Sequence, residues 1–385
     1  MVVPVRVEIS REMLEWARER ARLDEHALSQ RFPKLAEWER GEAKPTLKQL
    51  EKYAQATHTP VGYLLLETPP VEELPIPDFR TMRDATLERP SADLLDTIYQ
   101  SQQRQAWYAD FAEASGVERL AFVGSLNLSS SIVDSAATIR EALRFGVDER
   151  GPTWTEALSG LVLKSEELGI LVMINGVVGS NTRRKLDPRE FRGFALVDPL
   201  APVIFVNGAD TKAAQIFTLV HEVAHQWLGR GGLDDVDLSG SSNDEVELWC
   251  NRVAGEILVP QALLRQDFNA TAGLEDELDR LARTYKVSTL VILRGLRDAE
   301  FISATDYPDV FRTELSRVLD LIAERGGSGG NFYNTLPIRV SRKFAQALVA
   351  STLEGQTLYR DAFQMLGFRK LTTFEELAVK LGVTQ

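Results

Sequence analysis

The sequence predicts an α+β protein that is mostly helical and multi-domain, with a small mixed sheet in the same domain as a helix carrying His-Glu-x-x-His. Helical periodicity with capping signals covers most of the 385 residues. Two short runs rich in Val and Ile, Leu168–Ile174 and Ala201–Val206, are bounded by Gly, Pro and Asn and are typical of strands. The stretch TLVHEVAHQWLG, Thr218–Gly229, places two of only four histidines one helical turn apart.

Length and composition narrow the class of protein. A chain of 385 residues with 44% hydrophobic residues can bury more than one core. The single cysteine, Cys250, excludes an internal disulfide framework. The N-terminus has no long apolar segment and no window approaches a membrane span, so we expect a cytoplasmic protein with no membrane partner. The net charge of −12 argues against a broad nucleic-acid footprint but leaves room for a local basic patch.

Residues 1–67 are expected to form a domain of five short helices. The predicted ranges are Ser10–Arg22, Glu25–Arg31, Lys34–Arg40, Thr46–Ala56 and Val61–Leu66.

The segment WERGEAKPTLKQLEKYAQATHTPVGYLLL resembles repressor-like helix-turn-helix proteins. The spacing from Leu28 to Trp38 is about a turn shorter than in that pattern, which makes the helix-turn-helix degenerate and curtails the helix that would enter the major groove. Arg31, Lys34 and Arg40 are candidates for phosphate contacts, but a solvated helix face is the favoured interpretation because charges nearly cancel in this domain.

Three further segments follow. Residues 68–148 are expected to be a linker, PPVEELPIPDFRT, and a helical connector with helices at Ala92–Ser115 and from Ser129 to Gly146. Residues 149–304 hold the predicted strands and the histidine pair. Residues 305–385 are expected to be a C-terminal helical domain, interrupted by GGSGGN.

The histidine pair predicts a metal site. His221 and His225 are about 400° of helical rotation apart, so both imidazoles project from one face, as two ligands of a tetrahedral metal require. Glu222 lies about 100° away, where a carboxylate can act as general base on a water without being a ligand. The alternative is a helix that simply packs in the core through Phe217, Val220 and their apolar neighbours.

A third ligand is expected on the helix predicted for SSNDEVELWCNRVAGEILVP, where Ser242 and Glu245 are spaced as a capping box. Glu247 shares a stripe with Asn251, and we choose Glu247 as the ligand and Asn251 as the residue that holds a histidine ring. Asp244 is the alternative ligand. The competing interpretations are a dipole-favoured acid for Glu247 and a surface polar group for Asn251.

With these residues the chain resembles the ImmA/IrrE-type metallopeptidases, through FRGFALVDPLAPVIFVNGADTKAAQIFTLVHEVAHQWLG and EVELWCNRVAGEILVP. The resemblance implies a zincin-like metallopeptidase domain at 149–304. It also implies a zinc-dependent endopeptidase with His221, His225 and Glu247 as ligands and Glu222 as base. It further implies a regulatory protein as substrate, bound by edge pairing near Val203–Val206.

Three classes of function therefore remain. The leading one is a zinc endopeptidase that cuts a transcriptional regulator in a stress, mobile-element or toxin-antitoxin context. The second is an antitoxin-like or regulator-binding protein whose metal site is structural or vestigial. The third is a repressor that binds DNA through the N-terminal domain. Tyr285 and Tyr333 are considered as oxyanion donors, but structural roles are favoured for both.

Overall fold

The computed structural model describes residues 5–77, 90–234, 244–324 and 332–383. The backbone contacts divide the chain into two compact units, one of residues 1–75 with 82–99 and one of residues 76–81 with 100–385. Each unit is described by itself. Within the described residues, no helix combines the length and apolar character needed to cross a bilayer.

The first unit is a small helical bundle. Its elements are α1 (Arg11–Arg20), α2 (Glu25–Arg31), α3 (Leu35–Glu39), α4 (Leu47–Ala56) and the 3-10 turn η1 (Tyr63–Leu65). The helices α1, α2 and α4 begin where a short polar side chain accepts a hydrogen bond from a first-turn N–H, at Ser10, Asp24 and Thr46. The predicted helices are confirmed, except that the last is a 3-10 turn. The curtailed element is α3, which has five residues.

The second unit is built around a four-stranded mixed sheet. Its strands are β1 (Leu171–Asn175), β4 (Gly193–Leu196), β5 (Val203–Asn207) and β6 (Leu233–Asp234), in the order β1-β5-β4-β6. β1 and β5 are parallel, and the other neighbours are antiparallel. A separate two-stranded sheet joins β2 (Val177–Val178) to β3 (Asn181–Lys185).

This sheet confirms the α+β class and both predicted strands. It contradicts the expectation that a substrate pairs with a strand edge near Val203–Val206. The run Val203–Val206 lies in β5, which is paired with β1 on one side and β4 on the other. Its backbone groups are therefore used inside the sheet, and β5 offers no edge to a peptide. The edges of the sheet are β1 and the short β6.

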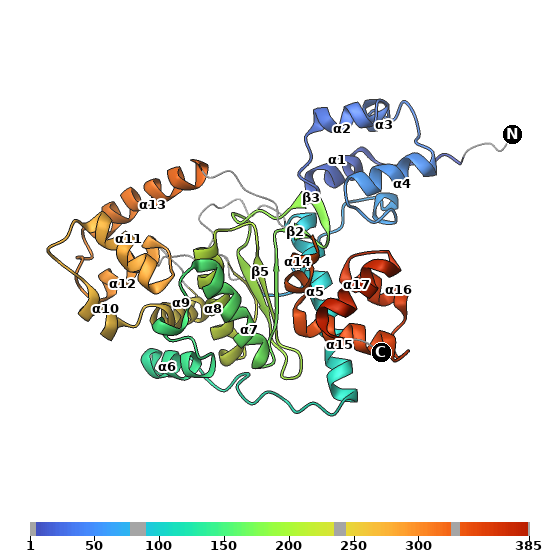
Figure 1. Cartoon of the computed structure of the whole chain (residues 1–385). Helices are drawn as coiled ribbons and strands as arrows, with labels where there is room; N and C mark the ends of the chain where they lie inside the picture. Colours follow the sequence, from blue (N-terminus) through green and yellow to red (C-terminus); the bar gives the residue numbers. More distant parts are fainter. Residues whose placement is uncertain (1–4, 78–89, 235–243, 325–331, 384–385) are drawn as a thin grey trace. The chain divides into compact units, whose positions relative to one another are not determined.

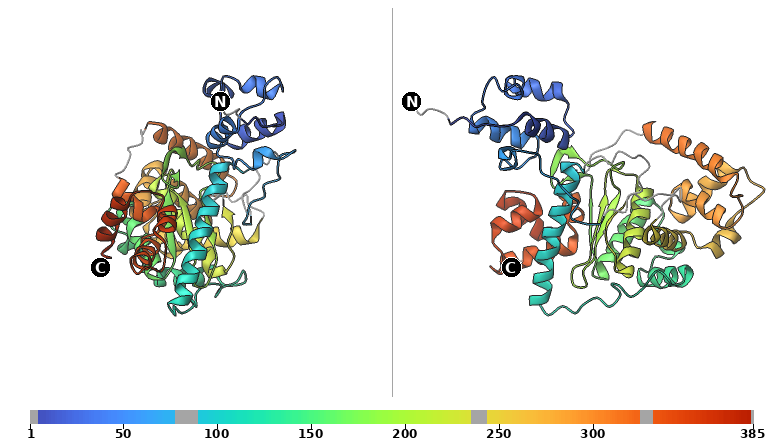
Figure 2. Two further views of the ribbon diagram at one scale, coloured as in Figure 1. Left: turned by 90° about the vertical axis from the view of Figure 1, so that its right-hand side faces the viewer. Right: turned by 180° about the vertical axis from the view of Figure 1, so that it is seen from behind.

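Helices cover both faces of the sheet. α7 (Trp154–Glu167) and α8 (Lys212–Leu228) lie on one face, and α14 (Phe332–Val340) and α15 (Arg342–Leu353) lie on the other (Figures 1 and 2). All five residues of β1 and of β5 are buried, as expected for strands covered on both faces. The C-terminal helices are thus part of the layer that buries the sheet.

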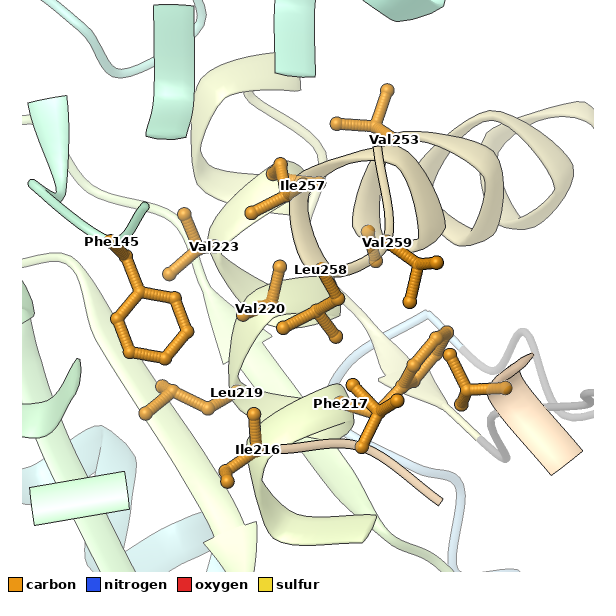
Figure 3. Close-up of a cluster of buried hydrophobic side chains, with 14 of the residues drawn as sticks. Phe145, Ile216, Phe217, Leu219, Val220, Val223, Val253, Ile257, Leu258 and Val259 are labelled. Carbon is orange, nitrogen blue, oxygen red and sulfur yellow. The ribbon is translucent and has the colours of Figure 1, made fainter. Parts of the chain in front are cut away.

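The largest core surrounds α8. Helices α6 (Ile132–Ala142), α9 (Glu245–Leu258) and α12 (Thr289–Asp298) contribute to it. Figure 3 shows Val220 and Val223 of α8 facing Ile257 and Leu258 of α9. Each such side chain contributes roughly 1.5–3 kcal/mol when it is removed from water. The helix that carries the histidine pair is therefore enclosed by apolar packing.

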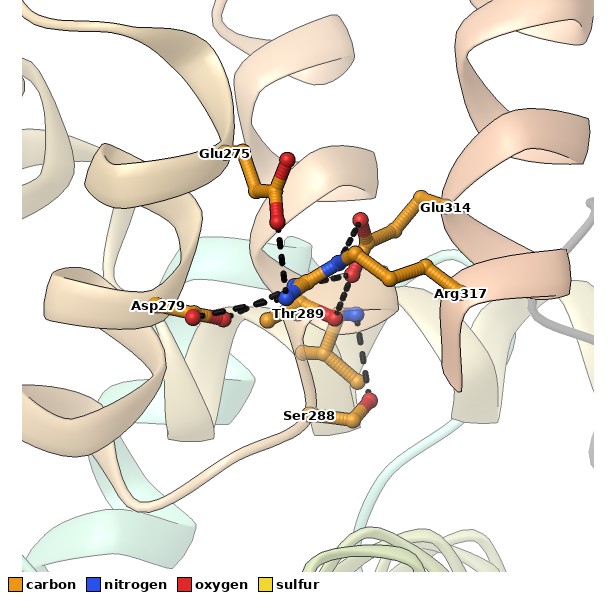
Figure 4. Close-up of polar contacts among 7 residues, drawn as sticks. Glu275, Asp279, Ser288, Thr289, Glu314 and Arg317 are labelled. Atoms are coloured by element: carbon orange, nitrogen blue, oxygen red, sulfur yellow. Dashed lines mark hydrogen bonds and ion pairs between the residues drawn. The ribbon is translucent and has the colours of Figure 1, made fainter. Parts of the chain in front are cut away.

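The remaining helices extend this unit. They are α5 (Ala92–Ala114, shared between the units), α10 (Gln261–Asp267), α11 (Leu274–Tyr285), α13 (Tyr307–Glu324), α16 (Tyr359–Leu366) and α17 (Leu371–Leu381), with a second 3-10 turn η2 (Val147–Glu149). Arg317 of α13 contacts Asp279 and Glu275 of α11 and Glu314 of its own helix (Figure 4). The four domain boundaries expected from the sequence remain a prediction.

Candidate metal centre

The helix α8 is buried on every side, so both histidines lie in the interior of the unit. It begins after Thr211, whose hydroxyl accepts a hydrogen bond from Ala214 N, and ends at Gly229 in the left-handed conformation, φ +71°. Every residue from Gln215 to Leu228 is buried. Polar side chains in such a helix need partners, because an unsatisfied buried polar group costs about 1–3 kcal/mol.

His221, His225 and Glu247 converge on one point. His221 Nε2 lies 3.2 Å from Glu247 Oε2, and His225 Nε2 lies 3.1 Å from Glu247 Oε1. The two histidine Nε2 atoms are 3.0 Å apart. The three side chains form a group of possible metal ligands, and all of them are buried. The structure therefore brings together the three residues chosen as ligands from the sequence.

The orientation of His225 is fixed by the loop that follows its helix. His225 Nδ1 lies 2.7 Å from the carbonyl oxygen of Arg230. A carbonyl oxygen can only accept, so Nδ1 carries the proton and donates it. Nε2 is then the unprotonated nitrogen that faces His221 and Glu247, as a metal ligand must be.

The spacing of these atoms suits a zinc ion. Bonds of about 2.0–2.1 Å at tetrahedral angles place two ligand atoms about 3.3 Å apart. The observed separations of 3.0, 3.1 and 3.2 Å are close to that value. Two imidazole nitrogens and one carboxylate are a donor set of catalytic zinc sites, which leave one coordination position open for water or substrate. The residues present therefore fit the metal.

The charge of Glu247 is stabilised by the two histidines. Burial alone would raise the pKa of Glu247, but attraction to His221 and the close polar contacts of the carboxylate with His221 and His225 outweigh it and lower the pKa. A carboxylate that stays ionised inside an apolar core is ready to bind a cation without first losing a proton.

Glu222, the predicted base, lies beside the sheet and is fully buried. A Cβ added to Gly193 of β4 would come 2.9 Å from Glu222 Oε1 and 2.5 Å from Thr218 Cγ2. Only glycine allows this close approach of the strand to the carboxylate. Gly193 was not predicted, although a glycine inside the apolar strand FRGFAL is the kind of signal that marks close backbone approach.

The alternative ligand Asp244 has another role. It is the N-cap of α9, and its Oδ1 accepts hydrogen bonds from Val246 N at 2.7 Å and Glu247 N at 3.3 Å. It thereby fixes the helix start just before Glu247. The predicted capping box is wrong, because the cap is Asp244 and not Ser242, which lies outside the described residues.

Asn251 is buried one turn after Glu247 on α9. Its Oδ1 accepts no hydrogen bond from the residues that the structure describes. The observed partner of His225 Nδ1 is the carbonyl of Arg230. A role for Asn251 in holding a ring remains a prediction.

The two tyrosines considered as oxyanion donors do not support that role. Tyr285 is buried, its hydroxyl donates to Asp267 Oδ2 at 2.7 Å, and burial, followed by that carboxylate, raises the pKa of its hydroxyl. It is a structural residue of α11. The side chain of Tyr333 lies outside the described part. Cys250 is buried in the apolar core.

Comparison with known families matches two segments. Residues 165–297 match the model of the Peptidase_M78 family, described as the IrrE N-terminal-like domain. This segment contains the whole His221, Glu222, His225 and Glu247 constellation. Residues 340–380 match a domain of unknown function, DUF8813. No match was found among curated proteins.

Proposed function

We propose that this chain, in which residues 165–297 match the IrrE N-terminal-like domain, is a zinc-dependent endopeptidase that hydrolyses a peptide bond in a specific protein partner. The observation that carries the proposal is the convergence of His221 Nε2, His225 Nε2 and the Glu247 carboxylate within 3.0–3.2 Å. The partner we propose is a cytoplasmic transcriptional regulator, cut under stress or during control of a mobile element or toxin-antitoxin pair.

Three residues would bind the metal in this reaction, and a fourth would transfer the proton. His221, His225 and Glu247 would hold the zinc ion, which when bound polarises the scissile carbonyl and makes water more acidic. Glu222 would take the proton from the attacking water as the new C–O bond forms. It would then deliver this proton to the nitrogen of the leaving amine, after which the C–N bond breaks. The core around α8 excludes bulk water, which strengthens these electrostatic interactions.

The first test is the metal content of purified protein. Wild type is expected to hold about one zinc per chain, His221→Ala to lose it, and Glu247→Ala to hold it more weakly. Glu222→Gln is the matched control, because it removes the base and leaves all three ligands. Wild-type protein that stays free of metal after zinc is added back would sink the peptidase proposal.

A second measurement separates an enzyme from a binding protein with a structural metal. Co-expression with candidate regulators is expected to yield cleaved regulator with wild type and intact, still bound regulator with Glu222→Gln. A regulator that is captured but never cut by the zinc-loaded wild type favours the regulator-binding alternative. Casein is a poor probe here, because a peptidase restricted to one partner leaves generic substrates intact.

A second candidate function is binding of nucleic acid by the first unit, and one observation favours it. A pocket of about 330 Å³ is lined by five basic side chains and by no acidic one. The basic residues are Arg6, Lys34, Lys44, Lys48 and Lys52. Of the three phosphate candidates in the sequence, only Lys34 lines it: Arg40 pairs with Glu42 at 2.8 Å, and Arg31 lies over the Phe32 ring.

This patch is tested by fluorescence anisotropy with a labelled duplex of random sequence. If all five cations contact phosphates, the logarithm of the binding constant should fall with the logarithm of salt with a slope of roughly −4 to −5. Lys48→Gln with Lys52→Gln should reduce the slope by about 2, whereas Lys370→Gln in the second unit should leave it unchanged. Absence of binding at low salt would remove nucleic acid as a partner.

A further inference from the structure

A pocket beside α8 and α9 lies one helical turn from the proposed metal ligands. It has a volume of about 370 Å³, and its lining includes Phe217 of α8 and Asn251 of α9. Phe217 is four residues before His221, and Asn251 is four residues after Glu247, the carboxylate that lies 3.2 Å from His221. Four residues of helix span about 6 Å, so the pocket begins about that far from the ligands along both helices. This distance is within the reach of a side chain on a peptide that is bound at the metal centre.

Two buried amide oxygens in the lining lack a donor among the residues that the structure describes. They are Asn251 Oδ1 and Gln261 Oε1. The orientation of the Gln261 amide is set, because its Nε2 donates to Gly295 O at 3.1 Å. A buried acceptor without a donor is destabilising, so the pocket favours a ligand that brings N–H or O–H groups. A carboxylate ligand cannot meet this need, since it has no hydrogen to donate.

The two acids of the lining already have basic partners. Asp298 pairs with Arg297 at 2.6 Å and with Arg294 at 3.9 Å. Glu256 is attracted to Arg140, which also donates to the backbone oxygen of Glu256 at 3.1 Å. A cationic ligand would therefore compete with these arginines for both carboxylates. The two acceptors thus favour a neutral donor, and no part of the recognition depends on the charge of Arg294.

The rest of the lining supplies an apolar floor and open space. Phe217, Val259 and Val291 are almost fully buried, and the first two belong to the cluster of buried side chains in Figure 3. A Cβ added to Gly255 would have no heavy atom within 4 Å. A hydrocarbon stem can therefore pack against the floor while its polar end reaches the two amide oxygens. The volume is at the small end of the range for ligand sites, about 300–1,000 Å³, which suits a side chain better than a large cofactor.

We propose that this pocket receives the side chain of a glutamine close to the bond that is cut in the partner protein. The carboxamide NH₂ group carries two hydrogens, one for Asn251 Oδ1 and one for Gln261 Oε1. The two methylene groups of glutamine pack on the floor. Serine and threonine bring only one donor hydrogen, and asparagine is one methylene shorter. The inference rests on the proposed peptidase function and names a residue of the substrate that this function would select.

Three pentapeptides provide the test, each with alanine on both sides of a central residue and with acetyl and N-methylamide ends. The central residue is glutamine, methionine or glutamate. Binding is measured by saturation-transfer NMR on zinc-treated Glu222→Gln, a full chain that is not expected to cut the peptides. The glutamine peptide should bind at least tenfold more tightly than the other two, because methionine and ionised glutamate carry no donor in the side chain. Equal binding of the three, or no binding of the glutamine peptide, overturns the proposal and leaves ordered water as the partner of the amide oxygens.

Cobalt(II) in place of zinc tests whether the pocket serves the metal centre. This ion is paramagnetic and speeds the relaxation of nearby nuclei. The glutamine side-chain protons should therefore relax faster on protein treated with cobalt than on protein treated with zinc. Equal relaxation on two preparations with matched metal content would separate the peptide from the metal centre and overturn its role as part of the substrate.

Gly255→Leu supplies the structural control, because it fills the pocket and improves helix propensity at the same time. It should lower the affinity for the glutamine peptide at least tenfold with zinc content unchanged. Gly160→Leu, at a helical glycine of α7 with no heavy atom within 4 Å of an added Cβ, should keep wild-type affinity. Retained binding by Gly255→Leu would place the peptide elsewhere and refute the site.

Failure of this inference is distinguishable from failure of the peptidase proposal. A chain that holds zinc but shows no preference for the glutamine peptide contradicts the pocket alone. A chain that prefers the glutamine peptide but never holds zinc contradicts the peptidase proposal, and with it the assignment of the glutamine to a cleaved substrate.

Discussion

Gly193 of β4 lies directly against Glu222 of α8, close enough that an added Cβ would come 2.9 Å from Glu222 Oε1. The same Cβ would come 2.9 Å from the carbonyl oxygen of Phe205 on the neighbouring strand. The strand backbone thus forms one wall of the space around the proposed base. A substitution at Gly193 in the sheet can therefore change the position of the Glu222 carboxylate on α8.

Gly193→Ala should therefore displace Glu222 without removing a ligand. We expect regulator cleavage to fall at least tenfold, zinc content to stay near one per chain, and the free energy of unfolding to fall by about 1–3 kcal/mol from overpacking. Gly160→Ala, in open space on α7, is the control and should be neutral or slightly stabilising. Wild-type cleavage by Gly193→Ala would show that the close approach has no catalytic consequence.

Arg150 donates hydrogen bonds to the C-terminal end of α9, the helix that carries Glu247. It is buried, its Nη1 donates to Leu258 O and Tyr285 O at 2.6 Å, and its Nη2 donates to Ile257 O at 3.0 Å. Arg150→Met keeps much of the volume but leaves three carbonyls without this donor. We expect urea denaturation to show a loss of about 3 kcal/mol or more. The exposed Arg119→Met should change stability by less than about 0.5 kcal/mol.

Arg317 and Arg312 allow the ion pairs of a partly buried arginine and of an exposed arginine to be compared. Its side chain is 23% exposed and joins Asp279 to the buried Glu314, which also accepts a hydrogen bond from Thr289 Oγ1. We expect Arg317→Met to lower the free energy of unfolding by about 1–3 kcal/mol, because it leaves a buried carboxylate without its cation. Arg312→Met breaks an exposed pair and should cost less than about 0.5 kcal/mol. Equal effects would show that burial of Glu314 does not matter.

Glu166 ties α7 to the C-terminal helices, since its Oε1 accepts a hydrogen bond from Ser341 Oγ at 2.5 Å. Burial raises the pKa of Glu166 above its ordinary 4.5, against the opposing effect of that hydrogen bond. The folded state then holds the proton more tightly than the unfolded state. The stabilisation is complete below about pH 4.5 and is lost as the pH rises through the folded pKa.

Glu166→Gln should accordingly flatten the dependence of stability on pH above 4.5, measured as urea midpoints. At pH 7 the variant should equal or slightly exceed wild type, because it no longer buries a charge. Ser341→Ala removes the hydroxyl and should steepen the loss. If the Glu166→Gln variant keeps the wild-type dependence of stability on pH, that dependence arises from other groups.

The sequence by itself determined the three candidate ligands of the metal centre that we propose. Two histidines four residues apart share a helix face whatever the rest of the chain does, so the positions of His221 and His225 followed from helix geometry alone. The stripe through Glu247 and Asn251 was likewise a property of one helix. Short capped helices in the first unit were predictable because a cap depends on neighbours within about four residues.

Only the tertiary structure decided the relations between distant segments. The strand order places Val203–Val206 inside the sheet, and it depends on pairing partners in β1 and β4 rather than on the pattern within β5 itself. The contact of Gly193 with Glu222 and the carbonyl of Arg230 behind His225 depend on chain reversals that no local period encodes. The physical reason is that periodicity reports on neighbours along one element, whereas a site is completed by packing between elements.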